Sequence, residues 1–117
     1  MRNKETITSG IAHNALALET VVKGNIKAEE DLRIDGKIEG DIECSGRVII
    51  GQQAEVNGGI KCENCDLYGK VEGNIYTGDT VRLRASAYLN GDLTTKFIEI
   101  EIGAMFNGSC RIVNGKP

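Results

Sequence analysis

A five-residue motif recurs six times along this chain, and it limits the possible folds more than any other feature. Each copy reads apolar, polar, Gly, small or polar, apolar. The copies are Val22–Ile26, Ile38–Ile42, Val56–Ile60, Val71–Ile75, Leu89–Leu93 and Phe106–Cys110. Their glycines are 16, 18, 15, 18 and 17 residues apart. A nearly fixed period indicates a solenoid, in which a repeat buries its apolar face only when a neighbour stacks on it.

Around each motif, apolar and polar residues alternate, which is the pattern of a β-strand with one buried face. Gly followed by Asn, Asp, Gly or Ser indicates a tight bend between two strands. Aligning the repeats on this glycine predicts six inward columns, in which each residue stacks on its counterpart in the next repeat at about 4.8 Å. The columns are Leu32, Val48, Cys65, Val81 and Ile98; Leu16, Ile34, Ile50, Leu67, Leu83 and Ile100; Ile26, Ile42, Ile60, Ile75, Leu93 and Cys110; Ala28, Cys44, Cys62, Thr77, Thr95 and Ile112; Thr20, Ala54, Ala87 and Ala104; and Val22, Ile38, Val56, Val71, Leu89 and Phe106.

Three strands and three corners per repeat predict one rung of a triangular solenoid. The uneven period comes from one corner of two lengths, three residues at Asp35–Lys37 and Tyr68–Lys70 but five at Gly51–Glu55 and elsewhere. We therefore expect an all-β fold, a triangular parallel β-helix of six rungs and roughly 29 Å in length. It should span residues 15–113, after a flexible tail (1–14) that includes the only histidine, His13, and before a short tail (114–117).

Composition limits the function. The net charge is −3, and the outward positions carry both signs, whereas nucleic-acid binding requires a basic stripe with stacking aromatics. The longest purely aliphatic run has three residues, Val48–Ile50, which is too short to span a membrane. The N-terminus lacks the apolar segment of a signal peptide. These features predict a cytoplasmic protein that does not bind nucleic acid.

Residues that carry chemistry are few. The spacing of Cys62 and Cys65 suits a redox or metal site, but a four-cysteine zinc site requires a second pair, and Cys44 and Cys110 stand alone. All four cysteines fall in inward columns, where a free thiol behaves as a small hydrophobic group. His13 has no identifiable partner for acid–base work. We expect free, unreactive thiols and no metal, cofactor or catalytic residue.

The ends of the predicted rod suggest assembly. The five residues Val113–Pro117 cannot cover the last rung, so unpaired backbone and apolar columns form a template for another layer of strands. We therefore predict end-to-end polymerisation through the end rungs, with contacts from Leu16, Leu18, Val22, Ile98, Ile100, Phe106 and Ile112. A weak membrane contact is expected from the N-terminal segment, through Met1, Arg2, Lys4 and Ile7.

Several segments of this sequence resemble those of a known protein family. Lys23–Ile26 and Asp31–Ile42, followed by Ile102–Gly108 in the final rung, resemble the bactofilins, which are polymer-forming cytoskeletal proteins of bacteria. The resemblance spans about residues 16–113. It implies a right-handed β-helix and nucleotide-independent filaments that lie at the inner face of the cytoplasmic membrane. Such filaments organise cell-wall enzymes or cell shape.

Two other classes compete with a scaffold. Left-handed β-helix acyltransferases repeat every six residues, and Cys44, Ile50, Val56 and Cys62 follow that spacing. Glycine spacings of 15, 16 and 17 break such a register, so the acyltransferase-like enzyme is the alternative rather than the main hypothesis. Secreted β-helical adhesins would require an export signal and long ranks of outward threonines. We favour the structural scaffold.

Overall fold

A computed structural model describes residues 13–113, in which every regular element is a β-strand. The strands form three faces of one solenoid, named here after their first strand. The β1 face contains β1 (His13–Leu16), β4 (Asp31–Ile34), β7 (Arg47–Ile50), the second halves of β9 (Ile60–Leu67) and β11 (Ile75–Leu83), and β14 (Phe97–Ile100). The β2 face contains β2 (Val21–Lys23), β5 (Lys37–Glu39), β8 (Glu55–Asn57), β10 (Lys70–Glu72), β12 (Tyr88–Asn90) and β15 (Met105–Asn107). The β3 face contains β3 (Ile26–Ala28), β6 (Ile42–Cys44), the first halves of β9 and β11, β13 (Leu93–Thr95) and β16 (Cys110–Ile112).

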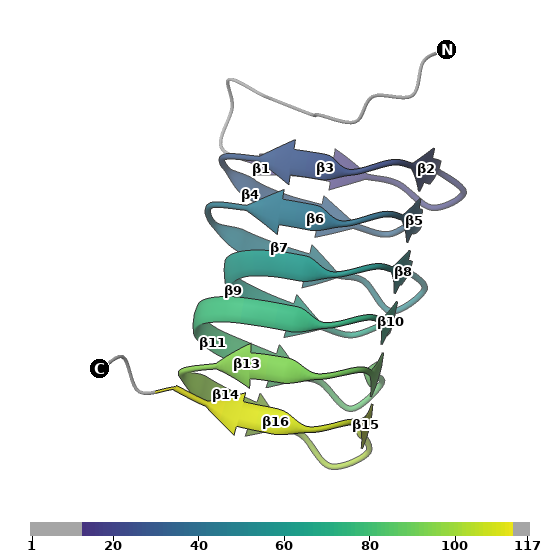
Figure 1. The fold of residues 1–117 in the computed structure, drawn as a ribbon. Helices are drawn as coiled ribbons and strands as arrows, with labels where there is room; N and C mark the ends of the chain where they lie inside the picture. Colours follow the sequence, from purple (N-terminus) through teal and green to yellow (C-terminus); the bar gives the residue numbers. More distant parts are fainter. Residues whose placement is uncertain (1–12, 114–117) are drawn as a thin grey trace.

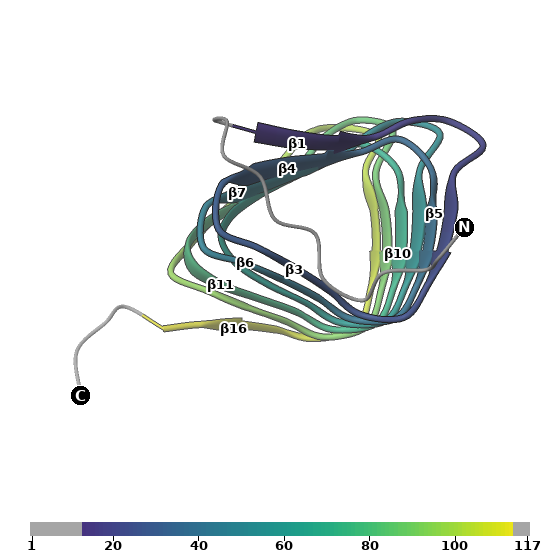
Figure 2. The ribbon, with the colours of Figure 1, turned by 90° about the horizontal axis from the view of Figure 1, so that it is seen from above.

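The chain winds as a right-handed triangular coil. Six rungs lie one above another, and all strand pairs in the described segment are parallel (Figure 1). Seen from the N-terminal end, the chain turns clockwise as it moves away from the viewer, around a triangular outline (Figure 2). The predicted fold is therefore confirmed, including the handedness that the resemblance implied.

Strand register confirms the inward columns. Ile26 pairs with Ile42 and Leu93 with Cys110, and the column between them continues without a break. Leu16 begins a second unbroken column that ends at Ile100. Aliphatic side chains in the middle rungs are almost fully buried, and these columns constitute the core. The first strand starts at His13, two residues before the expected start of the solenoid, and its backbone pairs with that of Asp31.

Two threonines lie inside this apolar core. Thr77 and Thr95 are buried on adjacent rungs, where their hydroxyl groups share a hydrogen bond. The Thr95 hydroxyl also lies 3.1 Å from the carbonyl oxygen of Asp79 and 3.0 Å from that of Phe97. A buried hydroxyl that finds a partner avoids most of its desolvation cost. The polar members of this inward column are therefore compatible with burial.

The corner between the β2 and β3 faces depends on glycine. Gly91 has φ of +150°, and a Cβ there would collide with the carbonyl oxygen of Gly73 in the preceding rung. The residue after the glycine links rungs by a side chain: the Asn74 Oδ1 accepts a 2.9 Å hydrogen bond from the Asp92 amide, and the Asp92 Oδ1 accepts one from the Ser109 amide at 3.2 Å. Asn25 and Asp41 make the same contacts in the first rungs. These residues thus form two short ladders along the rod, separated at Gly59, which has no side chain to continue them.

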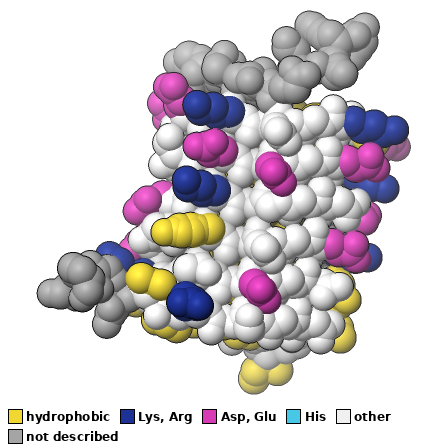
Figure 3. Space-filling model, in the orientation of Figure 1, with side chains coloured by type: hydrophobic (Ala, Val, Ile, Leu, Met, Phe, Trp, Pro, Cys, Tyr) yellow, Lys and Arg dark blue, Asp and Glu magenta, His cyan; other side chains and the backbone are white. Residues whose placement is uncertain are grey.

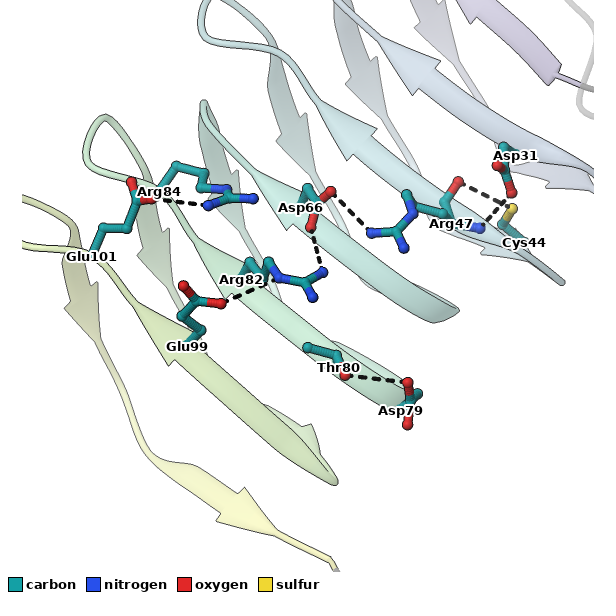
Figure 4. A network of polar contacts seen from close by, with 10 residues as sticks. All are labelled: Asp31, Cys44, Arg47, Asp66, Asp79, Thr80, Arg82, Arg84, Glu99 and Glu101. Carbon is teal, nitrogen blue, oxygen red and sulfur yellow. Dashed lines mark hydrogen bonds and ion pairs between the residues drawn. The ribbon is translucent and has the colours of Figure 1, made fainter.

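Charged residues on the β1 face neutralise one another (Figure 4). The Asp66 carboxylate accepts a 3.0 Å hydrogen bond from Arg47 and lies 3.5 Å from Arg82, which in turn pairs with Glu99 at 3.2 Å. Asp66 is nearly buried, and the two arginines offset the free-energy cost of burying its charge. The charged side chains of this network are thus paired with one another rather than free to bind a partner.

Candidate assembly surfaces

The C-terminal end of the rod is an open layer of strands. Among the residues described, β14, β15 and β16 each pair with only one neighbouring strand. Their inward residues begin to lose cover here: Phe106 and Ile98 are half-buried, whereas Ile100 and Ile112 are about half exposed. Their counterparts one rung earlier are fully buried. The last rung therefore presents an apolar, hydrogen-bonding edge.

The N-terminal end has the same character with a smaller apolar area. Within residues 13–113, β1, β2 and β3 also pair on one side only. Leu16 and Val22 are half-buried members of inward columns, and Leu18 is exposed at a corner. All seven polymerisation residues predicted from sequence thus lie in the two end rungs. Whether they join copies of the chain stays a prediction.

Several exposed apolar residues of the last rung were missed by the sequence reasoning. Ile102 is 97% exposed, Met105 58% and Phe97 57%, and Val113 is also exposed. They occupy corners or outward positions, so an alignment that follows inward columns passes over them. A comparison of outward positions could have found Phe97 and Met105, because the equivalent positions in the middle rungs carry polar residues.

A partly exposed ion pair holds the C-terminal corner in place. Arg84 donates a 2.9 Å hydrogen bond from its Nη1 to Glu101, and the other carboxylate oxygen of Glu101 accepts a 2.9 Å bond from the Ala85 amide. The Arg84 hydrogen bond, helped by the Ala85 amide, lowers the pKa of Glu101 below its ordinary value. The same pairing raises the pKa of Arg84. The corner that carries Ile102 and leads into β15 is thereby fixed to the preceding rung.

The cysteine prediction needs one correction. Cys44, Cys62 and Cys65 are buried as expected, but Cys110 is exposed, because no further rung within residues 13–113 covers its inward column. Burial raises the pKa of Cys44, and a hydrogen bond with Cys65 together with burial raises that of Cys62. These two thiols stay protonated and unreactive at neutral pH. Cys110 is instead open to solvent.

Shallow hollows lie along the β3 face. One of about 580 Å³ is lined by Asn74, Asp92, Thr94 and Arg111 around the exposed ring of Tyr76, and another of about 560 Å³ lies beside Lys61. Along this face basic, acidic and aromatic side chains follow one another down a single column (Figure 3). In the described part of the chain no three metal-ligating side chains form a cluster. The right-handed coil differs from the left-handed coil of the acyltransferases considered as the alternative.

The predicted membrane contact of Met1, Arg2, Lys4 and Ile7 lies outside the described residues. The part of the chain that is described has no helix long and apolar enough to cross a membrane.

Comparisons with known proteins identify relatives of this solenoid. The family model for bactofilins, described as polymer-forming cytoskeletal, matches residues 14–111. The chain is 30% identical to Bactofilin BacO of Myxococcus xanthus (strain DK1622) over 105 residues, which cover 90% of the chain and 83% of BacO. It is 26% identical to Bactofilin BacP of the same organism over 110 residues, which cover 94% of the chain but only 46% of BacP. No solved structure matches.

Proposed function

Since the chain belongs to the bactofilin family of polymer-forming cytoskeletal proteins, we propose that it is a scaffold whose rods join end to end into filaments without nucleotide. The single observation that carries this proposal is the open C-terminal rung. There, among the residues that the structure describes, Phe106 pairs with the fully buried Leu89 on one side and with no strand on the other. Burial of exposed apolar area and pairing of free strand edges both favour a second copy at this place.

Location and clients form the finer part of the proposal. The filaments would lie along the inner face of the cytoplasmic membrane and organise cell-wall or cell-shape machinery, as the family membership suggests. The N-terminal segment would supply the membrane contact through its early cations and Ile7. Binding of the purified protein to anionic vesicles, with and without residues 1–12, tests this part. Equal binding by both forms would exclude the segment as the anchor.

Electron microscopy of the purified chain, in buffer free of nucleotide, tests filament formation. We expect unbranched filaments whose axial repeat is a multiple of the rung spacing of about 4.8 Å. Sedimentation over a range of protein concentrations should show a threshold above which polymer appears. A protein that stays monomeric at high concentration would contradict the proposal.

A further inference from the structure

The sequence contains four Asn–Gly dipeptides, a pair that is prone to spontaneous chemical change in proteins. They are Asn57–Gly58, Asn90–Gly91, Asn107–Gly108 and Asn114–Gly115. The first three lie at the same place in three rungs, where β8, β12 and β15 of the β2 face end at the corner glycine. The fourth lies outside the described residues. The surroundings of one dipeptide can therefore be compared between two inner rungs and the last rung.

The chemistry of this change, deamidation, sets what the backbone must allow. The glycine nitrogen loses its proton to solvent base, attacks the asparagine Cγ and forms a new C–N bond, and the side-chain nitrogen leaves as ammonia. Water then opens the resulting five-membered succinimide at either carbonyl group, which gives aspartate or isoaspartate. Glycine favours the attack because it has no Cβ to shield its nitrogen. The reaction therefore requires a glycine N–H that is free to leave the β-ladder.

In the inner rungs the peptide unit between asparagine and glycine is held on both sides. The Asn90 carbonyl oxygen accepts a 3.0 Å hydrogen bond from the Gly73 amide, and the Gly91 N–H donates a 2.9 Å bond to the Asn107 carbonyl oxygen. Asn57–Gly58 is bonded in the same way to the rungs before and after it. Attack by either glycine nitrogen would first require a ladder bond in the middle of the rod to open. Such bonds open rarely, because neighbouring rungs must separate with them.

In the last rung the same peptide unit is held on one side only. The Asn107 carbonyl oxygen accepts the bond from Gly91, but within residues 13–113 the Gly108 N–H has no acceptor. Asn107 and Gly108 are both exposed, and among the described strands β15 pairs with β12 alone. Strands at the end of a ladder open more readily than strands inside it. Of the three glycine nitrogens compared, that of Gly108 is therefore the one that is free to attack.

We propose that Asn107 is a deamidation site that reacts at a free rod end and is closed when another copy docks there, the closure resting on the proposed end-to-end assembly. A docked copy would pair with the free edge of β15 and hold the Gly108 amide in place. Isoaspartate at position 107 would add one backbone atom before Gly108 and move β16 out of its register with β13. Rods that stay unassembled would thus lose their docking end with time, whereas rods inside filaments would keep it.

Peptide mapping by mass spectrometry, after timed incubation of dilute protein at mildly alkaline pH, tests the site. Asn107 should deamidate at least about tenfold faster than Asn57 and Asn90, because one additional hydrogen bond to break raises the barrier by about that factor. The same protein unfolded in urea gives the reference, in which the Asn–Gly pairs should react at similar rates. Reaction of Asn57 or Asn90 as fast as Asn107 in the folded rod would overturn the site.

The same mapping above the assembly threshold tests the closure. In filaments the rate at Asn107 should fall toward that of the two inner asparagines. Filaments seen by electron microscopy with an unchanged rate at Asn107 would overturn closure by docking. A protein that forms no filaments would refute the proposed function, whereas the comparison of the three asparagines in single rods would still decide the site.

Asn107→Gln is the matched control for the loss of the docking end. Glutamine keeps the amide, but its longer side chain closes the corresponding ring much more slowly. After incubation as dilute rods and subsequent concentration, Asn107→Gln should sediment like fresh protein. Aged wild type should leave a soluble fraction enriched in isoaspartate at position 107. Equal sedimentation of the two aged proteins, with wild-type Asn107 converted, would overturn the loss of the docking end.

Discussion

Replacing Phe106 by arginine is the most direct perturbation of the proposed junction. Phe106 is the one aromatic residue of its inward column, and it stacks on the fully buried Leu89. In a single rod the last rung is open, so an arginine there can turn its guanidinium toward water. In a filament the same side chain would be enclosed between two rods. The substitution should therefore affect assembly far more than folding.

The magnitude follows from burial. Full burial of a phenylalanine side chain contributes about 1.5–3 kcal/mol, and Phe106 has already gained part of this in the single rod. About 1 kcal/mol is therefore left for docking. Enclosing an unpaired guanidinium costs about 3 kcal/mol or more. Together these changes weaken each junction by about 4 kcal/mol, and since 1.4 kcal/mol is tenfold, the concentration needed for assembly should rise by about 700-fold.

Sedimentation and circular dichroism measured on the same samples check this prediction. Phe106→Arg should give small, soluble, β-rich species at concentrations at which the wild type sediments. Tyr76→Arg is the matched control, because it also exchanges an aromatic for an arginine, but at an outward position of the β3 face. It should leave filaments intact. The reasoning is refuted if Phe106→Arg keeps filaments of wild-type length, or if it unfolds the rod, since Phe106 would then act as a plug for the core.

Three further predictions concern the rod itself. Gly91→Ala should lower the free energy of unfolding in urea by about 3 kcal/mol or more, because it combines an unfavourable φ with a collision against the preceding rung, and Asn90→Ala should change it little. A thiol reagent should label Cys110 quickly and the three buried cysteines only after denaturation; rapid labelling of all four would contradict the buried assignments. Because the pKa of Glu101 is lowered in the folded chain, its stabilising pair with Arg84 is fully present above the ordinary glutamate pKa and is lost as pH falls through the lowered value. Glu101→Gln should thus lower the urea midpoint at pH 7, and the loss should shrink as pH falls below the ordinary glutamate pKa; an equal loss at every pH would exclude the ion pair.

The fold was readable from sequence because every rung repeats one physical solution. The apolar residue on each side of the corner glycine recurs six times, and the register of Val22 through Phe106 follows directly from that repetition. The two corner lengths were equally visible from the spacing of the repeats. The shorter corners each contain a glycine, Gly36 or Gly69, at which a Cβ would collide with backbone oxygens of the preceding rung.

What the sequence did not reveal depends on contacts between rungs rather than within them. Asn74 reads as a turn residue, and its hydrogen bond to the Asp92 amide becomes visible only when the rungs are stacked. Arg82 follows Asp66 by 16 residues, which is one rung, but only the inward columns were aligned, so the ion pairs of Asp66 with Arg47 and Arg82 were missed. The exposure of Cys110 was missed for a related reason, because the column alignment treats an end position as if it had neighbours on both sides.

The unbroken inward columns have a consequence for stability. Each rung contacts only its neighbours, so the free energy of the rod is close to a sum over interfaces between rungs, and the two ends are the weakest places. Another copy docked on an end would add the same kind of interface that already holds the rungs together. Folding and assembly would then be one continuous process, and fraying at the ends would cease inside a filament. The melting temperature of this protein should therefore rise with its own concentration, as that of a monomer does not.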